Sequence, residues 1–508
     1  MNRASGILMP VSSLPSPYGI GTLGKAAYKF VDFLAEAGQS YWQILPVGPT
    51  SYGDSPYQSP STFAGNPYFI DLDLLIEDGL LTGKEVKSRF FGDDPERADY
   101  GALYESRYPL LALATERGYE RDRDKVEAFV QENRSWLPDY ALYMALKRHF
   151  GMADWLSWPD EDVRLRKEEA LARYREMLSD DVRFFTYIQF LFFRQWDALR
   201  KYTHSKNIKI IGDLPIYVAL DSVDVWSSPE NFQLDEKNVP RCVAGVPPDY
   251  FSEDGQLWGN PLYDYEAMEK DGFGWWIRRI DGAGKLYDVI RIDHFRGFDS
   301  YWSVPYGAKT AREGKWVKGP GIRLVGVLRD WFRNIEFIAE DLGEPSPSVA
   351  QLLAESGFPG MKVLEFAFSP GEDSAFLPHN HIRNCVCYTG THDNLPVEGW
   401  RTEAAPQERK KAEAYLGLNE KEGYVHGFLR AGMGSVANLF VFQMQDCLTL
   451  PASSRMNTPG IPAGNWQWRM KSGAATASLA KKLRRMTALY GRCAMPAPAP
   501  KEEKKQVQ

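Results

Sequence analysis

The stretch Asp288-Val-Ile-Arg-Ile-Asp-His-Phe-Arg-Gly-Phe298 decides the fold of this chain. Val289 to Ile292 are apolar β-branched residues around a single arginine, which predicts a short buried strand. Side chains alternate across a strand, so Arg291 and Asp293 share one face while the two isoleucines share the other. Such a strand presents its charged pair at its C-terminal end, where (β/α)8 barrels carry catalytic groups. Taken alone, the stretch is equally consistent with a buried Arg–Asp ion pair that only satisfies itself.

Seven other stretches have strand-like sequence, and several of them end in an acid. They are residues 6–11, 41–47, 208–218, 336–343, 361–368, 385–394 and 438–446. A helical pattern over Lys25–Gly38 separates the first two, and strand–helix–strand order predicts a parallel sheet. We therefore predict an α/β fold, a (β/α)8 TIM barrel. Its strand ends would bring Asp213, Asp293, Glu340 and Asp393 to one mouth.

Two insertions interrupt the predicted barrel. Residues 51–205, after the second strand, carry several helical segments, and residues 219–285, after the third strand, are rich in loops, Pro, Gly and aromatics. We predict one catalytic barrel domain over residues 1–490. The sequence after position 450 is too short for a C-terminal β-sandwich, and the Pro- and charge-rich residues 491–508 are predicted to be a disordered tail.

Composition excludes several classes of function. The 508 residues carry 60 basic and 67 acidic side chains without a long basic block, which argues against nucleic acid and an anionic membrane surface. The 15 Trp and 26 Tyr supply flat faces of the kind that sugars stack on, although most single aromatics belong to the core. The five cysteines are sparse and odd in number, which predicts reduced thiols. With neither a signal-peptide pattern nor a bilayer-length apolar run, we expect a cytoplasmic protein. No feature of the sequence indicates an oligomeric state.

Carboxylates that meet at a barrel mouth, with few histidines and no nucleotide-binding loop, indicate glycosidic chemistry. A retaining mechanism needs an ionised carboxylate as nucleophile and a carboxylic acid of raised pKa. Arg291 would keep Asp293 ionised, because a neighbouring cation favours the charged form. Glu340, at the end of an apolar strand, is the candidate acid. Asp393 is a third carboxylate, suited to stabilising an oxocarbenium-like transition state.

A zinc site is a competing interpretation of one segment. His379, His381, Cys385 and Cys387 have the right ligand types. The two cysteines lie inside a predicted strand, however, where small buried thiols are ordinary core residues. We therefore predict neither a metal nor a cofactor.

Short motifs carry a family resemblance. Asp213, Arg291 with Asp293, Glu340, and His392 with Asp393 match in order the four motifs of the α-amylase superfamily. Longer runs resemble one branch of it, the amylomaltases or 4-α-glucanotransferases. These runs are residues 55–59, 63–68, 245–251, 255–261, 338–343, 388–394 and 464–469. The pair at 245–251 and 255–261 is the specific one, since the acid motifs alone do not separate a transferase from a hydrolase.

The resemblance implies a retaining 4-α-glucanotransferase that moves α-1,4-glucan segments between maltooligosaccharides through a covalent glycosyl-enzyme and releases glucose. It implies Asp293 as nucleophile, Glu340 as acid/base and Asp393 as transition-state stabiliser. The implied substrate-binding residues are Tyr57, Asp213, Tyr250, Phe251, Trp258, Arg291, His294 and His392. Two departures from the family pattern, at Ile461 and within Asn394–Trp400, flank the site and concern chain-length preference.

Two other functions stay open at this point. The same acids would serve a plain α-1,4-glucan hydrolase. A catalytically silent glucan-binding barrel is the second alternative, and the presence of all three acids argues against it.

Overall fold

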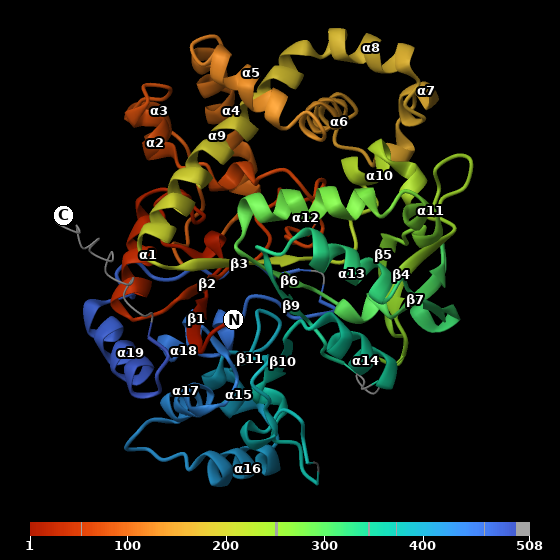
Figure 1. Ribbon diagram of the computed structural model, residues 1–508. Helices are drawn as coiled ribbons and strands as arrows, with labels where there is room; N and C mark the ends of the chain where they lie inside the picture. The colour runs from red at the N-terminus through yellow and green to blue at the C-terminus, as the bar shows by residue number, and fades with distance from the viewer. Residues whose placement is uncertain (52, 249–251, 344–345, 372, 462, 494–508) are drawn as a thin grey trace, which may run out of the picture.

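A parallel eight-stranded barrel forms the centre of the computed structural model, which describes residues 1–493 except 52, 249–251, 344–345, 372 and 462 (Figure 1). The strands follow the order β10-β11-β12-β1-β2-β3-β6-β9. Their bounds are β1 Ala4–Leu8, β2 Tyr41–Gln43, β3 Lys209–Leu214, β6 Val289–Ile292, β9 Glu336–Ala339, β10 Gly360–Val363, β11 Cys385–Tyr388 and β12 Leu439–Gln443. The backbone N–H of Ala339, at the end of β9, donates to the carbonyl of Pro359, just before β10 (2.9 Å), so the two outer strands of the order meet. The predicted TIM barrel and its eight strands are confirmed, with each strand no longer than its sequence pattern.

Nineteen helices of the α type surround the barrel or extend from it in the described part of the chain. They are α1 Lys25–Glu36, α2 Leu72–Glu77, α3 Gly83–Lys87, α4 Tyr100–Gly118, α5 Arg123–Glu132, α6 Leu137–His149, α7 Glu161–Arg164, α8 Glu168–Met177, α9 Ser179–Ser205, α10 Val223–Ser227, α11 Tyr265–Lys270, α12 Gly274–Leu286, α13 Ile322–Trp331, α14 Pro347–Ser356, α15 Val397–Glu403, α16 Pro406–Leu416, α17 Tyr424–Gly434, α18 Met444–Cys447 and α19 Ala477–Leu489. None of these described helices is both long and apolar enough to cross a membrane.

The helical insertion between β2 and β3 contains α2 to α9 and stands on one side of the barrel (Figure 1). Its longest element is α9, whose apolar side chains recur at helical spacing and are buried, among them Phe185, Ile188, Phe192 and Leu199. The chain turns at Leu178, which separates α8 from α9.

A second, antiparallel sheet was not predicted. Its strands are β4 Cys242–Val246, β5 Gln256–Pro261, β7 Ser300–Pro305 and β8 Lys315–Lys318, in the order β5-β4-β7-β8. The first two strands lie in the predicted insertion over residues 219–285, whereas β7 and β8 follow the barrel strand β6. The loop-rich insertion therefore shares one sheet with the segment that comes directly after Asp293.

The chain remains packed beyond the predicted domain end at residue 490. Arg492 is fully buried. Its guanidinium donates to the carbonyl oxygens of Ala4 (2.7 Å), Met433 (2.9 Å), Ser435 (2.8 Å) and Ala437 (2.9 Å). Residues 491–493 are thus part of the barrel, which corrects the predicted start of the tail; residues 494–508 lie outside the described residues.

Removing the Arg492 side chain is predicted to destabilise the seam between β1 and the segment before β12. Arg492→Ala removes a buried donor from four carbonyl oxygens, of which those of Met433 and Ser435 keep a hydrogen bond from Arg3, so we expect the free energy of unfolding to fall by about 2–4 kcal/mol. Urea unfolding followed by tryptophan fluorescence measures it. Arg485→Ala, on the exposed side of α19, is the matched control. Equal midpoints for the two variants would show that Arg492 does not hold this seam.

Candidate active site

Arg291 is the buried hub of the barrel mouth. Its Nη1 atom donates to both oxygens of Asp213 (2.7 and 2.6 Å) and to Oδ1 of Asp293 (3.1 Å), and its Nε faces the Met361 sulfur (3.4 Å). Arg291 and Asp213 are register partners in the β3–β6 pair, so the parallel sheet itself brings them together. The second oxygen of Asp213 also accepts from the Tyr57 hydroxyl (2.7 Å). These contacts unite four of the predicted site residues.

Asp293 follows β6 directly and keeps part of its carboxylate exposed. Burial raises the pKa of Asp293 to about 7, opposed by Arg291 and reinforced by Asp213, Glu340 and Asp393. Arg291 favours the ionised form of Asp293, as expected, but burial and the neighbouring carboxylates outweigh it. Asp213 lies closer to the guanidinium than Asp293 does. The negative charge of Asp213 therefore offsets much of the stabilisation that Arg291 gives to ionised Asp293.

Glu340 follows β9 and lies at the same mouth as Asp293. Its Oε2 accepts from the backbone N–H of His294 (2.8 Å), the residue next to Asp293, and its Oε1 accepts from the N–H of Leu342 (2.7 Å). Burial raises the pKa of Glu340, against the opposing effects of Arg291 and these two N–H groups. A carboxyl that keeps its proton at this position can act as a general acid.

Asp393 and His392 come from the loop after β11. His392 Nε2 lies 3.3 Å from Oδ2 of Asp393, and the His392 ring stacks on Tyr57 (centroids 5.2 Å apart, planes 18° apart). The Trp466 ring lies beside both, 5.6 Å from Tyr57 and 5.9 Å from His392. Nδ1 of His392 is buried without a hydrogen-bond partner among the described residues. The mouth therefore has an aromatic wall built from Tyr57, His392 and Trp466.

The opposite wall carries Trp258 and His294. Trp258 lies on β5 and its ring meets the edge of the His294 ring (4.9 Å). His294 has a left-handed backbone (φ 52°) and burial, with a smaller effect of Arg296, lowers its pKa to about 4, so it is neutral at pH 7. The predicted contacts Tyr250 and Phe251 lie outside the described residues.

Sequence reasoning missed the residues that hold Asp393 in place. Asn457 donates from Nδ2 to Oδ1 of Asp393 (2.6 Å), and its backbone N–H donates to the carbonyl of His392 (3.1 Å). Arg455 donates to the carbonyls of Asp393 and Asn457. Asn457 lies four residues before Ile461, where the sequence departs from the family pattern. That departure drew attention to this segment but did not show the role of Asn457.

Two further buried carboxyl groups at the mouth were also missed. Glu365 follows β10, and Oε1 of its side chain has no hydrogen-bond partner among the described residues. Burial and then Asp446 raise the pKa of Glu365, while burial raises that of Asp446 to about 6. Asp446 accepts from the Thr389 hydroxyl (2.5 Å) and from the Val397 N–H (2.8 Å), at the two ends of the loop that carries His392 and Asp393. Asp446 therefore fastens both ends of that loop.

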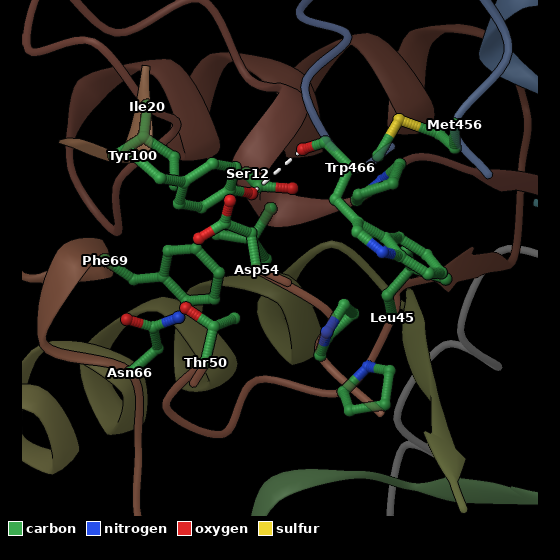
Figure 2. Close-up of a pocket in the computed structure, with 14 residues that line it drawn as sticks. Ser12, Ile20, Leu45, Thr50, Asp54, Asn66, Phe69, Tyr100, Met456 and Trp466 are labelled. Carbon is green, nitrogen blue, oxygen red and sulfur yellow. Dashed lines mark hydrogen bonds between the residues drawn. The ribbon is translucent and has the colours of Figure 1, made fainter. Parts of the chain in front are cut away.

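A small cavity adjoins the aromatic wall behind Trp466 (Figure 2). Its volume is about 20 Å³, and Figure 2 shows it bounded by Asp54, Phe69, Tyr100, Met456 and Trp466. Tyr100 donates its hydroxyl hydrogen to the Trp466 carbonyl (2.9 Å), the dashed line in Figure 2. Trp466 has a left-handed backbone (φ 65°), and this bond holds it there. The space is large enough for one water molecule.

The candidate zinc ligands are engaged elsewhere. His381 is bonded through both ring nitrogens, to Ser435 (2.7 Å) and to the Phe376 carbonyl (2.9 Å), and His379 meets Tyr415 (2.6 Å). Cys385 donates to the Ile382 carbonyl (3.0 Å). In the part of the chain that the structure describes, no group of three or more His, Cys, Asp and Glu side chains is arranged to hold a metal.

The geometry therefore provides two carboxyl groups of raised pKa beside each other, a third carboxylate across the mouth and flat walls on either side. That set can protonate a leaving oxygen, form a glycosyl ester and stabilise positive charge on a sugar ring.

Known structures match both the barrel and its insertions. The amylomaltase from Streptococcus agalactiae in complex with acarbose superposes with a TM-score of 0.95 at 43% identity, covering 97% of this chain and 100% of that one. The amylomaltase from Corynebacterium glutamicum, at 18% identity, shares the fold with a TM-score of 0.76, covering 97% of this chain and 75% of that one.

Sequence comparisons cover nearly the whole chain. The 4-alpha-glucanotransferase of Clostridium butyricum is 49% identical over 487 residues, 96% of this chain and 100% of that protein. That of Thermus thermophilus is 47% identical over 495 residues, 95% of this chain and 98% of that protein. The 4-alpha-glucanotransferase family profile matches residues 9–476. With the barrel, the acids at its mouth and these matches together, the chain belongs to the 4-alpha-glucanotransferase family.

Proposed function

We propose that this chain transfers α-1,4-glucan segments between maltooligosaccharides by a retaining mechanism, with Asp293 as nucleophile, Glu340 as acid/base and Asp393 as transition-state stabiliser. The observation that carries the proposal is the pair formed by Asp293 and Glu340, two neighbouring carboxyl groups whose pKa values are both raised. The 4-alpha-glucanotransferase relatives and the acarbose complex of the Streptococcus agalactiae amylomaltase support an α-glucan as substrate.

The productive form of the pair carries one proton. Glu340 holds it and gives it to the departing glycosidic oxygen, while ionised Asp293 attacks the anomeric carbon and forms the ester. Glu340 then takes a proton from the acceptor hydroxyl, which attacks the ester and releases Asp293. Asp393, fixed by Asn457, faces the positive charge that develops on the sugar ring between these states.

Binding of the sugar at the cleavage point falls to the groups around the acids. Tyr57 and His392 offer a stacked aromatic wall, and Arg291 and Asp213 form the polar floor. Trp258 and His294 form the wall on the other side. We assign the acceptor to this side, because the loop whose sequence carries Tyr250 and Phe251 leads into β5. The five cysteines are free thiols, which supports placing the enzyme in the reducing cytoplasm.

Transfer requires that a sugar hydroxyl outcompetes water for the ester. Water is present at about 55 M, but positioned groups reach effective molarities of about 10⁵ M or more, so a held acceptor wins. Hydrolysis, the alternative reaction, uses the same acids and differs only in that water attacks the ester.

The nucleophile assignment predicts the behaviour of Asp293→Asn. The amide cannot form the ester, so we expect the rate on maltotriose to fall by at least about three orders of magnitude while maltooligosaccharide binding persists. Calorimetric titration and initial rates measure the two properties. Asp281→Asn, an exposed position on α12, is the control. A variant of Asp293 that keeps a tenth of the activity would sink the assignment.

The acid assignment predicts a pH dependence. As pH falls, Asp293 gains a proton and attack stops; as pH rises through the raised pKa of Glu340, the acid is lost, so the rate on maltotriose should be bell-shaped. Glu340→Gln should lose about three orders of magnitude on maltotriose but keep fluoride release from α-glucosyl fluoride in the first turnover, since fluoride leaves without a proton. With this donor, the rate of Glu340→Gln should no longer fall at high pH. If that fall stays with the fluoride donor, another group is the titrating acid.

Product analysis on maltotriose separates transferase from hydrolase. We expect free glucose with a ladder of longer α-1,4 oligomers, at nearly constant total reducing ends. Trp258→Ala should raise the reducing ends formed per donor cleaved several-fold, because a loosely held acceptor competes less well with water. Reducing ends that climb steadily in the unmodified protein, without a ladder, would make it a hydrolase.

A further inference from the structure

The loop that connects β4 and β5 is attached at its described end to a short 3₁₀ helix, η6 Ala311–Glu313. The carbonyl of Asp254 accepts from the N–H of Ala311 (3.0 Å). Arg312 adds two side-chain contacts, from Nε to Oδ1 of Asp254 (2.7 Å) and from Nη2 to Oε1 of Glu253 (3.0 Å). Four residues further on, Trp258 reaches the mouth beside His294.

The 3₁₀ helix is in turn fixed to β7. Trp302 donates from Nε1 to the Ala311 carbonyl (2.8 Å). Its ring covers Gly314 so closely that a Cβ there would lie 2.2 Å from the indole nitrogen. β7 follows β6 and Asp293 after one 3₁₀ turn, Phe295–Phe298. The helix that carries Arg312 is therefore attached to the continuation of the strand that ends at Asp293.

We propose that Arg312 is a positioning residue for the acceptor: it ties Glu253 and Asp254, and through them the loop before Trp258, to the sheet that extends the nucleophile strand. The inference rests on the proposed function, in which this side of the mouth receives the acceptor. Arg312 touches no reacting group and acts through the placement of the loop.

The exposure of the three side chains determines what such a contact can do. Glu253 is 92% exposed, Asp254 63% and Arg312 49%. Exposed ion pairs are weak and are screened by salt, so they contribute little to the stability of the whole protein. They can still bias the positions that a surface loop occupies. Because transfer depends on how closely the acceptor is held, a modest bias changes the partition of the glycosyl ester between sugar and water.

The experiment measures the hydrolysed share, the reducing ends formed per donor cleaved, for the unmodified protein and Arg312→Gln with maltotriose. We expect the variant to raise this share about three- to fivefold, the range that one weak ion-pair cluster supports. The KM for a glucose acceptor should rise, whereas first-turnover fluoride release from α-glucosyl fluoride should change less than twofold. A thermal melt within about 2 °C of the unmodified protein excludes general destabilisation.

Salt provides a second readout that a purely structural role would not move. Raising ionic strength from about 0.02 to 0.5 M should increase the hydrolysed share of the unmodified protein, because the exposed pairs are screened. In Arg312→Gln the share should already be high and respond little. Combining Arg312→Gln with Glu253→Gln and Asp254→Asn should add little to the single variant, since the three side chains form one unit.

Arg323→Gln is the matched control. It removes another exposed ion pair, between Arg323 on α13 and Glu269 on α11, and should leave the hydrolysed share and its salt response at the values of the unmodified protein. If the unmodified protein makes a ladder and Arg312→Gln keeps its share and salt response, the inference is overturned while the proposed function stands. If the unmodified protein makes no ladder, the proposed function fails and this inference fails with it.

Discussion

A single buried guanidinium group organises this molecule. Arg291 is removed from water, and a buried charge of this kind persists only with close, well-oriented partners. Asp213 supplies them from the neighbouring strand, at the position opposite Arg291 in the β3–β6 register. A shift of one residue between these strands would turn Arg291 to the other face of the sheet, among apolar side chains. The ion pair and the strand register therefore specify each other, and the acids at the mouth take their places from that register.

The same contact sets the proton balance of the site. Because both oxygens of Asp213 bind the guanidinium, Asp293 receives only a share of its charge and faces Glu340 and Asp393 as well. A nucleophile with a strongly lowered pKa would be a weak base and a good leaving group, and would hold its ester poorly. In the mechanism that we propose, a moderately basic Asp293 beside a protonated Glu340 would balance attack against release, which a two-step transfer needs in both directions.

Sequence patterns predicted what is local and missed what is assembled from a distance. The eight barrel strands were found because each is a short apolar run, and the three acids because they close such runs. Strands β4, β5, β7 and β8 were missed: β8 is largely exposed, and the pairing of β4 with β5 shifts register between Val243 and Gly245. Asn457 lies outside the strand-like stretches, and its role depends on contacts with the loop after β11. The charge balance at Asp293 has the same origin: spacing showed Arg291 two residues away but did not show that Asp213 on β3 shares its guanidinium.

The small antiparallel sheet links the catalytic centre of the barrel to the wall that we assign to the acceptor. A hydrolase and a transferase can share the same acids, so the difference between them lies in the surroundings of the second attack. Here the strand that ends at Asp293 continues through a 3₁₀ turn into β7, and β7 pairs with β4, whose hairpin partner β5 carries Trp258. The wall that we assign to the acceptor is thus hydrogen-bonded to the segment that follows Asp293. To move that wall relative to Asp293, hydrogen bonds of the sheet must break or the loop between β4 and β5 must bend. Bending the loop is the easier motion, because the contacts of Glu253 and Asp254 with Arg312 lie at the surface.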